Sequence, residues 1–558
     1  MEEISDDVFE RIKDFDHLYL TEEQTLLINR LILNEELKGR YKDYGLCNEC
    51  KQPKITCRWC QCKFQRNFNN WTSGNHEVDN FIQKFQLKAR YYSEIIEWID
   101  YDRFENIEYL SKGGFGTTSK AIWKDGYIEY WDFEKNRWKR GKKGNETYLV
   151  ALKCLHNSQD ITAEFLKEIE SHITAINSHY VTRCHGFTKD SESNNFMMVM
   201  EYVENGSLRQ YLNNCFNSMK WDEKLDMLRH IVSGLDDIHK KGVTHHNFHS
   251  GNILKGRNST YITDLGLYQP ANVKSIDEHK KVYGVLPYIA PEILRGEEYT
   301  QESDIYGFGI VAYEVCTGLP PYHDIAHDAF LAISICQGQR PKSNYKIPRI
   351  ILDTIKQCWD AEPSKRPKAN ELYNLLHDLC NDIYSNYYDS DLEINKQIEE
   401  VVKINEKLIS ISPTYTSTTL SYITNSRAIY TSRLLDFKDL PEPKNAIDTD
   451  EDGDLSEEYS YSAISYDEKG NTGAYIQIII NLYLIGDGVH TTTERDGDIY
   501  GLFIRPEIFN PDYGKRLLLT FLIIMKITFV LVLIIDNFLI MELQNLCKSI
   551  VEDVLPLE

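Results

Sequence analysis

The sequence predicts a protein of the α+β class that consists of several parts. Residues 104–380 alternate strand-like with helix-like segments, such as YLVALKCL and AEFLKEIESHI. The chain of 558 residues is 42% hydrophobic and 26% charged, which is typical of a globular protein with a large core. Changes in composition divide it into four parts, which are 1–103, 104–380, 381–474 and 475–558.

The overall charge and the cysteine content restrict the class of protein. The formal net charge of −23 would repel a phosphate backbone, so we expect no nucleic-acid partner. The N-terminal stretch MEEISDDVFERIKDFD is acidic and has no apolar core, which predicts that there is no secretory signal. Without secretion, the 13 cysteines indicate thiols or metal ligands rather than a disulfide framework. We therefore expect a cytoplasmic protein.

Residues 1–103 open with a predicted helix. Thr21 and Gln24 form a capping-box pattern ahead of the stretch LLINRLILNEELKGR. Apolar residues recur on one face of this stretch, as in an amphipathic helix. They are Leu27, Ile28, Leu31 and Ile32.

A cysteine cluster follows in the sequence CNECKQPKITCRWCQC. Its members are Cys47, Cys50, Cys57, Cys60 and Cys62. Two CxxC pairs can each bind a soft cation through thiolates on a tight turn, which predicts a Zn²⁺ knuckle. The predicted ligands are Cys47, Cys50, Cys57 and either Cys60 or Cys62. The gap of six residues between the pairs is shorter than usual for a zinc ribbon, and free, partly buried thiols are the alternative.

The C-terminal parts differ from the rest in composition. Residues 381–474 are polar and contain SPTYTSTTLSYITNS and the acidic run DTDEDGDLSEE, which predicts a disordered linker. Residues 475–558 are apolar, and the run at 517–535 is just long enough to span a bilayer. Lys526 at its centre costs about 2.5–3.5 kcal/mol, which the surrounding apolar residues outweigh at about 0.3–0.6 kcal/mol each. A membrane anchor is predicted, with a buried helix or a coding-region artefact as alternatives.

The motifs of residues 104–380 carry the chemistry. YLSKGGFGTTSKAIWKDG fits two strands joined by a glycine-rich turn, in which Gly113, Gly114 and Gly116 would let the backbone approach phosphates. In YLVALKCL, Lys153 is the single charge on an apolar strand. Glu168 on the following helix is available as its partner.

Six further motifs follow in order. They are FMMVMEYVENGSLRQYL, HHNFHSGNIL, YITDLGLYQP, GVLPYIAPEIL, SDIYGFGIVAYEVCTGLPPY and CWDAEPSKRP. The whole series resembles the protein kinase family, and the last two motifs resemble its tyrosine-kinase-like group of serine/threonine kinases. The resemblance covers about half of the chain. It implies a two-lobed fold with a small lobe, mainly antiparallel sheet up to about Met200, and a mainly helical large lobe.

The resemblance also implies ATP and Mg²⁺ as ligands and proteins as substrates or partners. Gly113 and Gly116 would cover the ATP phosphates, with Ser111 where a first glycine is common. Lys153 would hold the α- and β-phosphates and would be positioned by Glu168.

Further roles are implied in the same way. Met200 would be the gatekeeper, and the backbones of Glu201 and Val203 would bind adenine. Asn252 and Asp264 would hold Mg²⁺.

Three residues would support the large lobe. Glu292 and Arg366 would form a buried ion pair that braces this lobe. Asp304 would fix the catalytic loop.

The catalytic loop departs from the family pattern at its central position. In H-R-D-x-x-x-x-N the third residue is an aspartate that orients the acceptor hydroxyl and takes its proton. Counting back from Asn252 places Asn247 at this position. An amide oxygen can accept a hydrogen bond but cannot take the proton. General-base catalysis contributes about 10²–10⁴-fold, so turnover should suffer more than nucleotide binding.

Two neighbouring residues depart as well. His246 replaces an arginine that commonly pairs with a phosphorylated activation-loop residue, for which Ser275 and Tyr283 are candidates. His249 replaces the lysine common in serine/threonine kinases. We expect an ATP- and Mg²⁺-binding pseudokinase that acts in signalling. The alternatives are a slow but active serine/threonine kinase and a membrane-anchored adaptor.

Overall fold

The structure is a computed structural model. It describes residues 3–114, 116–141, 147–159, 161, 166, 169–170, 173, 178–265, 282–384, 392–411, 422–446, 477–485, 488–492 and 499–502. The chain divides into two units, Met1–Thr449 and Asp450–Glu558, which are described separately.

Short helices at the N-terminus form a small core of their own. They are α1 (Asp6–Ile12), α2 (Glu22–Leu31) and α3 (Glu35–Tyr44). The predicted capping box is confirmed, since the Thr21 amide donates to Gln24 Oε1 at 2.9 Å and the Gln24 amide donates to Thr21 Oγ1 at 3.2 Å. The expected helix is shorter than its apolar pattern, because Asn34 caps a new helix by accepting from the Leu37 amide at 3.0 Å.

The next segment joins these helices to the small lobe. Its helical elements are α4 (Cys62–Gln65), η1 (Phe68–Asn70), α5 (His76–Lys88), η2 (Tyr92–Glu94) and η3 (Tyr101–Arg103). Val78, Phe81 and Ile82 of α5 pack into the core beneath the sheet of the small lobe. Phe81 meets Phe187 edge-on, with ring centroids 5.9 Å apart. Helix α5 therefore covers one face of the small lobe, although its sequence precedes the recognisable motifs.

The small lobe is built on a sheet. Its strands are β1 (Glu97–Trp98), β2 (Phe104–Lys112), β3 (Gly116–Trp123), β6 (Tyr148–Leu155), β7 (Cys184–Lys189) and β8 (Phe196–Glu201). In the described residues they are ordered β1-β7-β8-β6-β3-β2, and every neighbour is antiparallel except the pair β1 and β7. A separate hairpin consists of β4 (Tyr127–Asp132) and β5 (Arg137–Gly141). The expected mainly antiparallel small lobe is thus confirmed.

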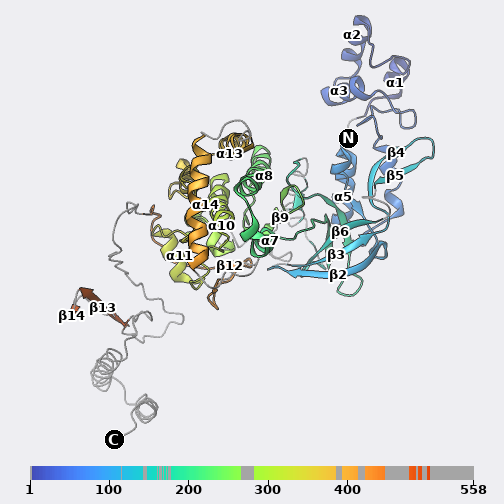
Figure 1. Ribbon diagram of the computed structural model, residues 1–558. Helices are drawn as coiled ribbons and strands as arrows, with labels where there is room; N and C mark the ends of the chain where they lie inside the picture. The colour runs from blue at the N-terminus through green and yellow to red at the C-terminus, as the bar shows by residue number, and fades with distance from the viewer. Residues whose placement is uncertain are drawn as a thin grey trace. The chain divides into compact units, whose positions relative to one another are not determined.

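The large lobe is mainly helical, as expected (Figure 1). Its helical elements are α7 (Leu208–Cys215), η4 (Phe216–Ser218), α8 (Trp221–Lys240), η5 (Ser250–Asn252), η7 (Leu286–Tyr288), α9 (Pro291–Leu294), α10 (Gln301–Thr317), α11 (Ala329–Cys336), α12 (Arg349–Cys358), η8 (Pro363–Lys365) and α13 (Ala369–Tyr384). Its short strands are β9 (Ile253–Lys255), β10 (Thr260–Ile262) and β11 (Val282–Gly284). Helix α10 is buried from Ser303 to Thr317, as expected for a helix that is apolar on nearly all sides.

The prediction of a disordered linker at 381–474 is wrong for the part that the structure describes. Helix α14 (Glu393–Ile411) lies alongside the helices of the large lobe in Figure 1, and its Ile394 and Val401 join the core. Residues 422–446, with β12 (Arg433–Leu435), also pack on this lobe. The polar composition concealed an amphipathic helix with its apolar residues at helical spacing. The run DTDEDGDLSEE lies outside the described residues.

The unit Asp450–Glu558 contains a small sheet in the residues described. Strand β13 (Gln477–Ile485) pairs with β14 (Gly488–Thr492) in antiparallel fashion and with β15 (Ile499–Leu502) in parallel fashion. Among the helices that the structure describes, none has the length and apolar character to cross a membrane. The run at 517–535 lies outside the described residues.

Candidate active site

A cleft of about 570 Å³ brings the predicted site residues together. Residues from the glycine-rich turn, β6 and β8 line one side, and residues from the loop around η5 line the other. The predicted residues that line it are Ser111, Gly113, Gly114, Gly116, Lys153, Met200, Glu201, Val203, Asn247, His249, Asn252 and Asp264. Glu168 lies outside the described residues. Motifs that are up to about 150 residues apart in sequence therefore meet in one cavity.

The glycine-rich turn is held closed by its own backbone. The Gly113 amide donates to the Gly116 carbonyl at 2.8 Å. A Cβ atom at Gly116 would lie 2.3 Å from the Cys154 carbonyl oxygen, and one at Gly114 would lie 2.1 Å from the Ser432 carbonyl oxygen. Neither position has room for a side chain, which explains glycine at both.

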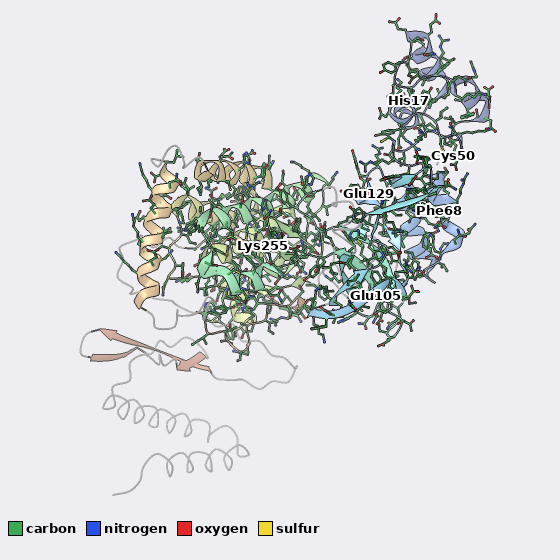
Figure 2. The ribbon with its side chains drawn as sticks, turned by 45° about the vertical axis from the view of Figure 1, so that its right-hand side comes forward. His17, Cys50, Phe68, Glu105, Glu129 and Lys255 are labelled. Atoms are coloured by element: carbon green, nitrogen blue, oxygen red, sulfur yellow. The ribbon has the colours of Figure 1, made fainter. Side chains whose placement is uncertain are left out.

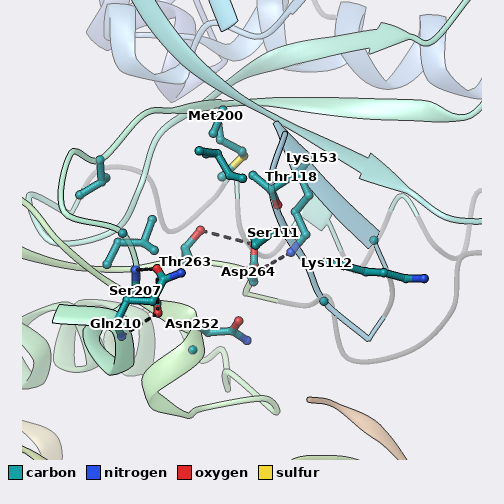
Figure 3. Close-up of a pocket in the computed structure, with 18 of the residues that line it drawn as sticks. Ser111, Lys112, Thr118, Lys153, Met200, Ser207, Gln210, Asn252, Thr263 and Asp264 are labelled. Carbon is teal, nitrogen blue, oxygen red and sulfur yellow. Dashed lines mark hydrogen bonds and ion pairs between the residues drawn. The ribbon is translucent and has the colours of Figure 1, made fainter. Parts of the chain in front are cut away.

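Lys153 and Asp264 face each other across the cleft and form an ion pair (Figure 3). Strand β6 fixes Lys153 between Thr118 of β3 and Met198 of β8. Asp264 has a φ of +63°, in the left-handed region that aspartate tolerates better than most residues. The sequence did not predict this pair, because it offered Glu168 as the partner of the lysine.

Asp304 holds the loop that precedes η5, as the sequence predicted. Its carboxylate accepts from the His245 amide at 2.8 Å and from the His246 amide at 3.3 Å, and it lies 3.0 Å from His239 Nε2. Burial alone would raise the pKa of Asp304, but the hydrogen bond with His239 and the nearby imidazoles lower it. The carboxylate thus stays ionised inside the lobe and anchors two successive amides.

Asn247 and Asn252 are joined within this loop. Asn252 Nδ2 donates to the Asn247 carbonyl at 3.0 Å, and the Thr263 amide donates to the Asn252 carbonyl at 2.9 Å. The Asn247 side chain is buried, and its Oδ1 accepts a 2.8 Å hydrogen bond from Ser432 Oγ. The amide at this position therefore contacts a hydroxyl group.

The two substituted histidines of the loop, the partly buried His246 and the buried His249, are uncharged at neutral pH. Burial lowers the pKa of His246 to about 4, and its ring stacks on Tyr299 with centroids 4.7 Å apart. Burial also lowers the pKa of His249 to about 3, and its Nδ1 accepts from the Gly251 amide at 3.1 Å. Neither side chain offers a cation to a phosphate group.

The structure describes one of the two candidate phosphorylation sites. Tyr283 is buried in β11, where its carbonyl accepts from Tyr299 Oη at 2.9 Å. Ser275 lies outside the described residues.

Glu292 and Arg366 form the buried ion pair that the sequence predicted. The guanidinium meets the carboxylate in a bidentate arrangement with distances of 2.6 and 2.8 Å. Arg366 also donates to the Glu302 carbonyl at 2.9 Å, so the start of α10 is tied to the same pair. The contact connects three segments of the large lobe.

A second group of functional side chains lies in the N-terminal region, where Figure 2 labels Cys50. The sulfur atoms of Cys47, Cys50, Cys60 and Cys62 all lie within 4.8 Å of one another. Cys47 and Cys62 are 3.7 Å apart and Cys50 and Cys60 are 3.4 Å apart. Four thiolates around one Zn²⁺ at ~2.3 Å would have sulfur atoms roughly 3.8 Å apart, so the donor set fits this ion.

The predicted ligand set needs one correction. Cys57 is exposed and lies outside the cluster, whereas Cys60 and Cys62 both belong to it. The first pair, Cys47 and Cys50, lies on a tight turn. In this turn the Lys51 amide donates to the Cys47 carbonyl at 2.9 Å. Cys62 is the first residue of helix α4, and Cys60 lies two residues before it; both are buried in the cluster, which the CxxC spacing of Cys57 and Cys60 could not reveal. Hydrogen bonding to Cys47 and Cys50 raises the pKa of the Cys60 thiol.

The two lobes, the cleft between them and the bracing ion pair define a protein kinase domain. The family model for protein tyrosine and serine/threonine kinases matches residues 104–376, and this part of the chain belongs to that family. The chain is similar to serine/threonine-protein kinase dst3 of Dictyostelium discoideum, with 25% identity over 58% of this chain and 58% of the relative. It is also similar to a protein kinase and PP2C-like domain-containing protein of Arabidopsis thaliana, with 29% identity over 32% of each chain. The chain thus spans less than two thirds of the length of these relatives.

Sequence reasoning missed one segment of the site entirely. Tyr430, Thr431 and Ser432 line the cleft, although they belong to the part that was expected to be a disordered linker. The apolar pair Leu434 and Leu435 beside them was an available signal for a strand.

Proposed function

We propose that the kinase domain binds ATP with Mg²⁺ and that its transfer of phosphoryl groups to protein serine or threonine is weakened or lost. In this proposal Lys153 holds the α- and β-phosphates, with Glu168 as its support. Asn252 and Asp264 bind Mg²⁺. Protein kinases generally use this nucleotide and this metal ion, and the ion pair of Lys153 with Asp264 supports a site ready for both.

The nucleotide base is assigned in the same way. The backbones of Glu201 and Val203 would bind adenine beside Met200, and all three residues line the cleft. Ser111, Gly113, Gly114 and Gly116 would cover the phosphates. The absence of room for side chains at Gly114 and Gly116 supports a close approach of backbone to ligand.

The observation that carries the proposal is the amide at Asn247. A carboxylate at this place accepts the proton of the acceptor hydroxyl, but an amide oxygen only accepts a hydrogen bond. The expected loss is about 10²–10⁴-fold in the rate of transfer, or roughly 3–5 kcal/mol of barrier. Binding of the nucleotide does not depend on this side chain, so it should persist.

The uncharged histidines point in the same direction. A neutral His246 offers no ionic contact to a phosphorylated activation segment, and a neutral His249 offers none to the γ-phosphate. The loop therefore lacks three charges that assist transfer, and a role through binding rather than turnover is favoured.

A slow serine/threonine kinase is the second candidate. Lys153, Asp264 and Asn252 share one cleft, and much of phosphoryl transfer depends on positioning and on metal ions rather than on a base. The relatives include serine/threonine kinases, which is compatible with a slow kinase and with a pseudokinase alike. The rate of transfer separates the two.

We further propose that the four clustered cysteines bind one structural Zn²⁺. Their sulfur geometry supports a closed four-thiolate site with no position for substrate. Such a site would stabilise the segment between α3 and α4, which otherwise contains little regular structure.

Two measurements on the full chain test the proposed function. Millimolar Mg-ATP should raise the melting temperature, because a ligand of the native state stabilises it by mass action. Transfer of phosphate to a generic protein acceptor should be far below the ~1–100 s⁻¹ of kinases. No thermal shift would refute nucleotide binding, and transfer in the ordinary range would refute the loss of catalysis.

A further inference from the structure

The segment 422–446 is held on the large lobe by contacts before, along and after strand β12. Strand β12 adds to β11 in antiparallel register, with Leu435 opposite Val282 and Arg433 opposite Gly284. An extended segment that adds to the edge of a strand gains its affinity from main-chain hydrogen bonds. The β11 strand lies just before η7 and α9 in the chain.

Side chains secure the segment before this strand. Tyr430 Oη donates to the Pro321 carbonyl at 2.9 Å. The Ile429 amide donates to His327 Nδ1 at 3.0 Å, and Arg433 donates to the His327 carbonyl at 2.5 Å. Leu435 is buried in the core of the large lobe. The path of the chain through the cleft is therefore fixed by specific contacts.

Further contacts secure the segment after the strand. Glu442 forms a bidentate ion pair with Arg295, at 2.5 and 2.7 Å. The Lys444 amide donates to the Cys336 carbonyl at 2.8 Å, and Asn445 Oδ1 accepts from the Ala361 amide at 2.6 Å. Anchors on both sides leave the residues between them little freedom to leave the cleft.

Ser432 occupies the chemically decisive place on this path. Its hydroxyl donates to Asn247 Oδ1 at 2.8 Å and is largely buried, with the residue 8% exposed. Its carbonyl lies against Gly114 of the glycine-rich turn. A hydroxyl that contacts the base position beneath the phosphate-covering turn has the placement of a phosphoryl acceptor.

We propose that residues 422–446 occupy, in cis, the groove that receives a protein acceptor, with Ser432 in the place of the acceptor hydroxyl. The inference rests on the proposed function, since it assigns the regulation of the same site. The segment excludes other acceptors from the groove. It becomes the acceptor itself when a carboxylate replaces the amide of Asn247.

The chemical step in that variant is ordinary phosphoryl transfer. Ser432 Oγ attacks the γ-phosphorus of bound ATP and forms a new oxygen–phosphorus bond. The bond from the γ-phosphorus to the bridging oxygen breaks, and ADP leaves with the electron pair. The hydroxyl proton passes to the introduced carboxylate.

The first experiment maps phosphate on the full chain carrying Asn247→Asp after incubation with Mg-ATP. Mass spectrometry should place the phosphate on Ser432, and the initial rate per molecule should not change with protein concentration, as a reaction in cis requires. Adding Ser432→Ala should remove this phosphate, whereas Thr431→Ala, one residue away, should keep it. Phosphate at other positions only, or a rate that rises with concentration, would overturn the inference.

The second experiment needs no nucleotide. A fluorescent peptide with the sequence of residues 422–446 is titrated into the full chain and followed by anisotropy. The unmutated chain should exclude it, a Tyr430→Ala/Arg433→Ala double variant should bind it at least tenfold more tightly, and Leu434→Ala should behave as unmutated. Leu434 is the matched control because it lies on the same strand and is 44% exposed.

The outcomes separate the inference from the proposed function. Equal binding of the peptide by all three chains, or binding by none while each keeps a cooperative melting transition, would overturn the inference whatever the nucleotide does. Loss of the Mg-ATP thermal shift in the unmutated chain would refute the proposed function alone. Absence of any phosphate on Asn247→Asp, with nucleotide bound and peptide excluded, would show occupancy of the groove without an acceptor role and would overturn the assignment of Ser432.

Discussion

The ammonium group of Lys153 is paired with the carboxylate of Asp264 across the cleft, and the two side chains are only 16% and 18% exposed. This contact joins strand β6 of the small lobe to the segment that follows β10 in the large lobe. In the proposed complex Lys153 would exchange the carboxylate for phosphate oxygens, and Asp264 would exchange the ammonium for Mg²⁺. Both residues line the cleft, so the pair keeps them where the proposed nucleotide would bind.

Replacing Lys153 should remove most of the response to nucleotide. Saturation at ~100 times the dissociation constant stabilises a native protein by about 2.7 kcal/mol, which is several degrees of melting temperature for a domain of this size. Lys153→Ala should abolish most of this rise because the phosphates lose their cation. Lys124→Ala is the control, since Lys124 pairs with Glu105 on the surface. Equal rises in all three chains would exclude Lys153 from the nucleotide site.

Metal content should depend on the four clustered cysteines and not on Cys57. The purified full chain should contain about one equivalent of zinc, as a closed four-thiolate site requires. Cys60→Ser should remove it, because Cys60 lies within the cluster, whereas Cys57→Ser should retain it. Elemental analysis of the three chains provides the measurement. A folded, metal-free parent chain would leave the cluster as free thiols, and loss of metal in Cys57→Ser would restore the ligand set predicted from spacing.

Breaking the buried ion pair should destabilise the large lobe strongly. Arg366→Ala leaves Glu292 buried without its guanidinium partner, which should cost about 3–5 kcal/mol of unfolding free energy. The neighbouring Lys365→Ala should cost at most about 0.5 kcal/mol, because its pair with Glu362 is exposed. Urea unfolding monitored by fluorescence compares the two. Similar losses in both variants would show that Arg366 does not brace the lobe.

Stability should fall in mild acid partly through His246. Its pKa is lowered by burial to about 4 from an ordinary value of 6.5, while Asp304 opposes and His245 reinforces this shift. Between these two values the unfolded chain binds a proton that the folded chain does not, so stability is full above pH 6.5 and is lost as the pH falls toward 4. His246→Asn should flatten this slope, since asparagine does not titrate and tolerates the φ of +67°.

The matched control for acid stability is a surface histidine. His76 on α5 is 83% exposed, so His76→Asn should keep the slope of the unmutated chain. Melting temperatures between pH 4 and 7 give the measurement. A slope that is unchanged in His246→Asn would mean that other buried groups control the acid response.

The resemblance of short motifs to the protein kinase family was sufficient to predict the small lobe, the large lobe and nearly all residues of the cleft. Lys153, Asn252 and Asp264 lie in short motifs whose spacing reflects the strands and turns that carry them. The pair of Lys153 with Asp264 was not predictable, because two alternative carboxylates were available and only the fold decides between them. The contact of Asn247 with Ser432 joins residues 185 positions apart, and no local pattern encodes it.

The predictions for the zinc ligands and for the linker failed for related reasons. Spacing paired Cys57 with Cys60. In the structure Cys62, at the start of α4, joins Cys60 in the cluster in place of Cys57. The polar composition of 381–474 suggested disorder, yet a few buried residues such as Ile394 and Leu435 are enough to dock its segments on an existing core. Composition averages over residues that pack and residues that do not, so it cannot locate such anchors.

The supporting variant of the catalytic loop is His246→Arg. An arginine there serves a phosphorylated activation segment and not the acceptor hydroxyl, so alone it should change the rate of transfer little. Combined with Asn247→Asp, it should add less than threefold. A large gain from His246→Arg alone would mean that the missing cation, rather than the missing carboxylate, limits transfer.

The measurement that tests the central claim most directly is the steady-state rate of phosphoryl transfer by the full chain beside its Asn247→Asp variant, with Mg-ATP saturating. Total phosphate incorporation is counted, on the chain itself and on an added basic protein. The account predicts that the variant is faster by up to ~10²–10⁴-fold while its affinity for ATP is unchanged, because the new carboxylate acts on the acceptor hydroxyl alone. Transfer by the unmutated chain at the ~1–100 s⁻¹ usual for kinases, with no gain in the variant, would contradict it.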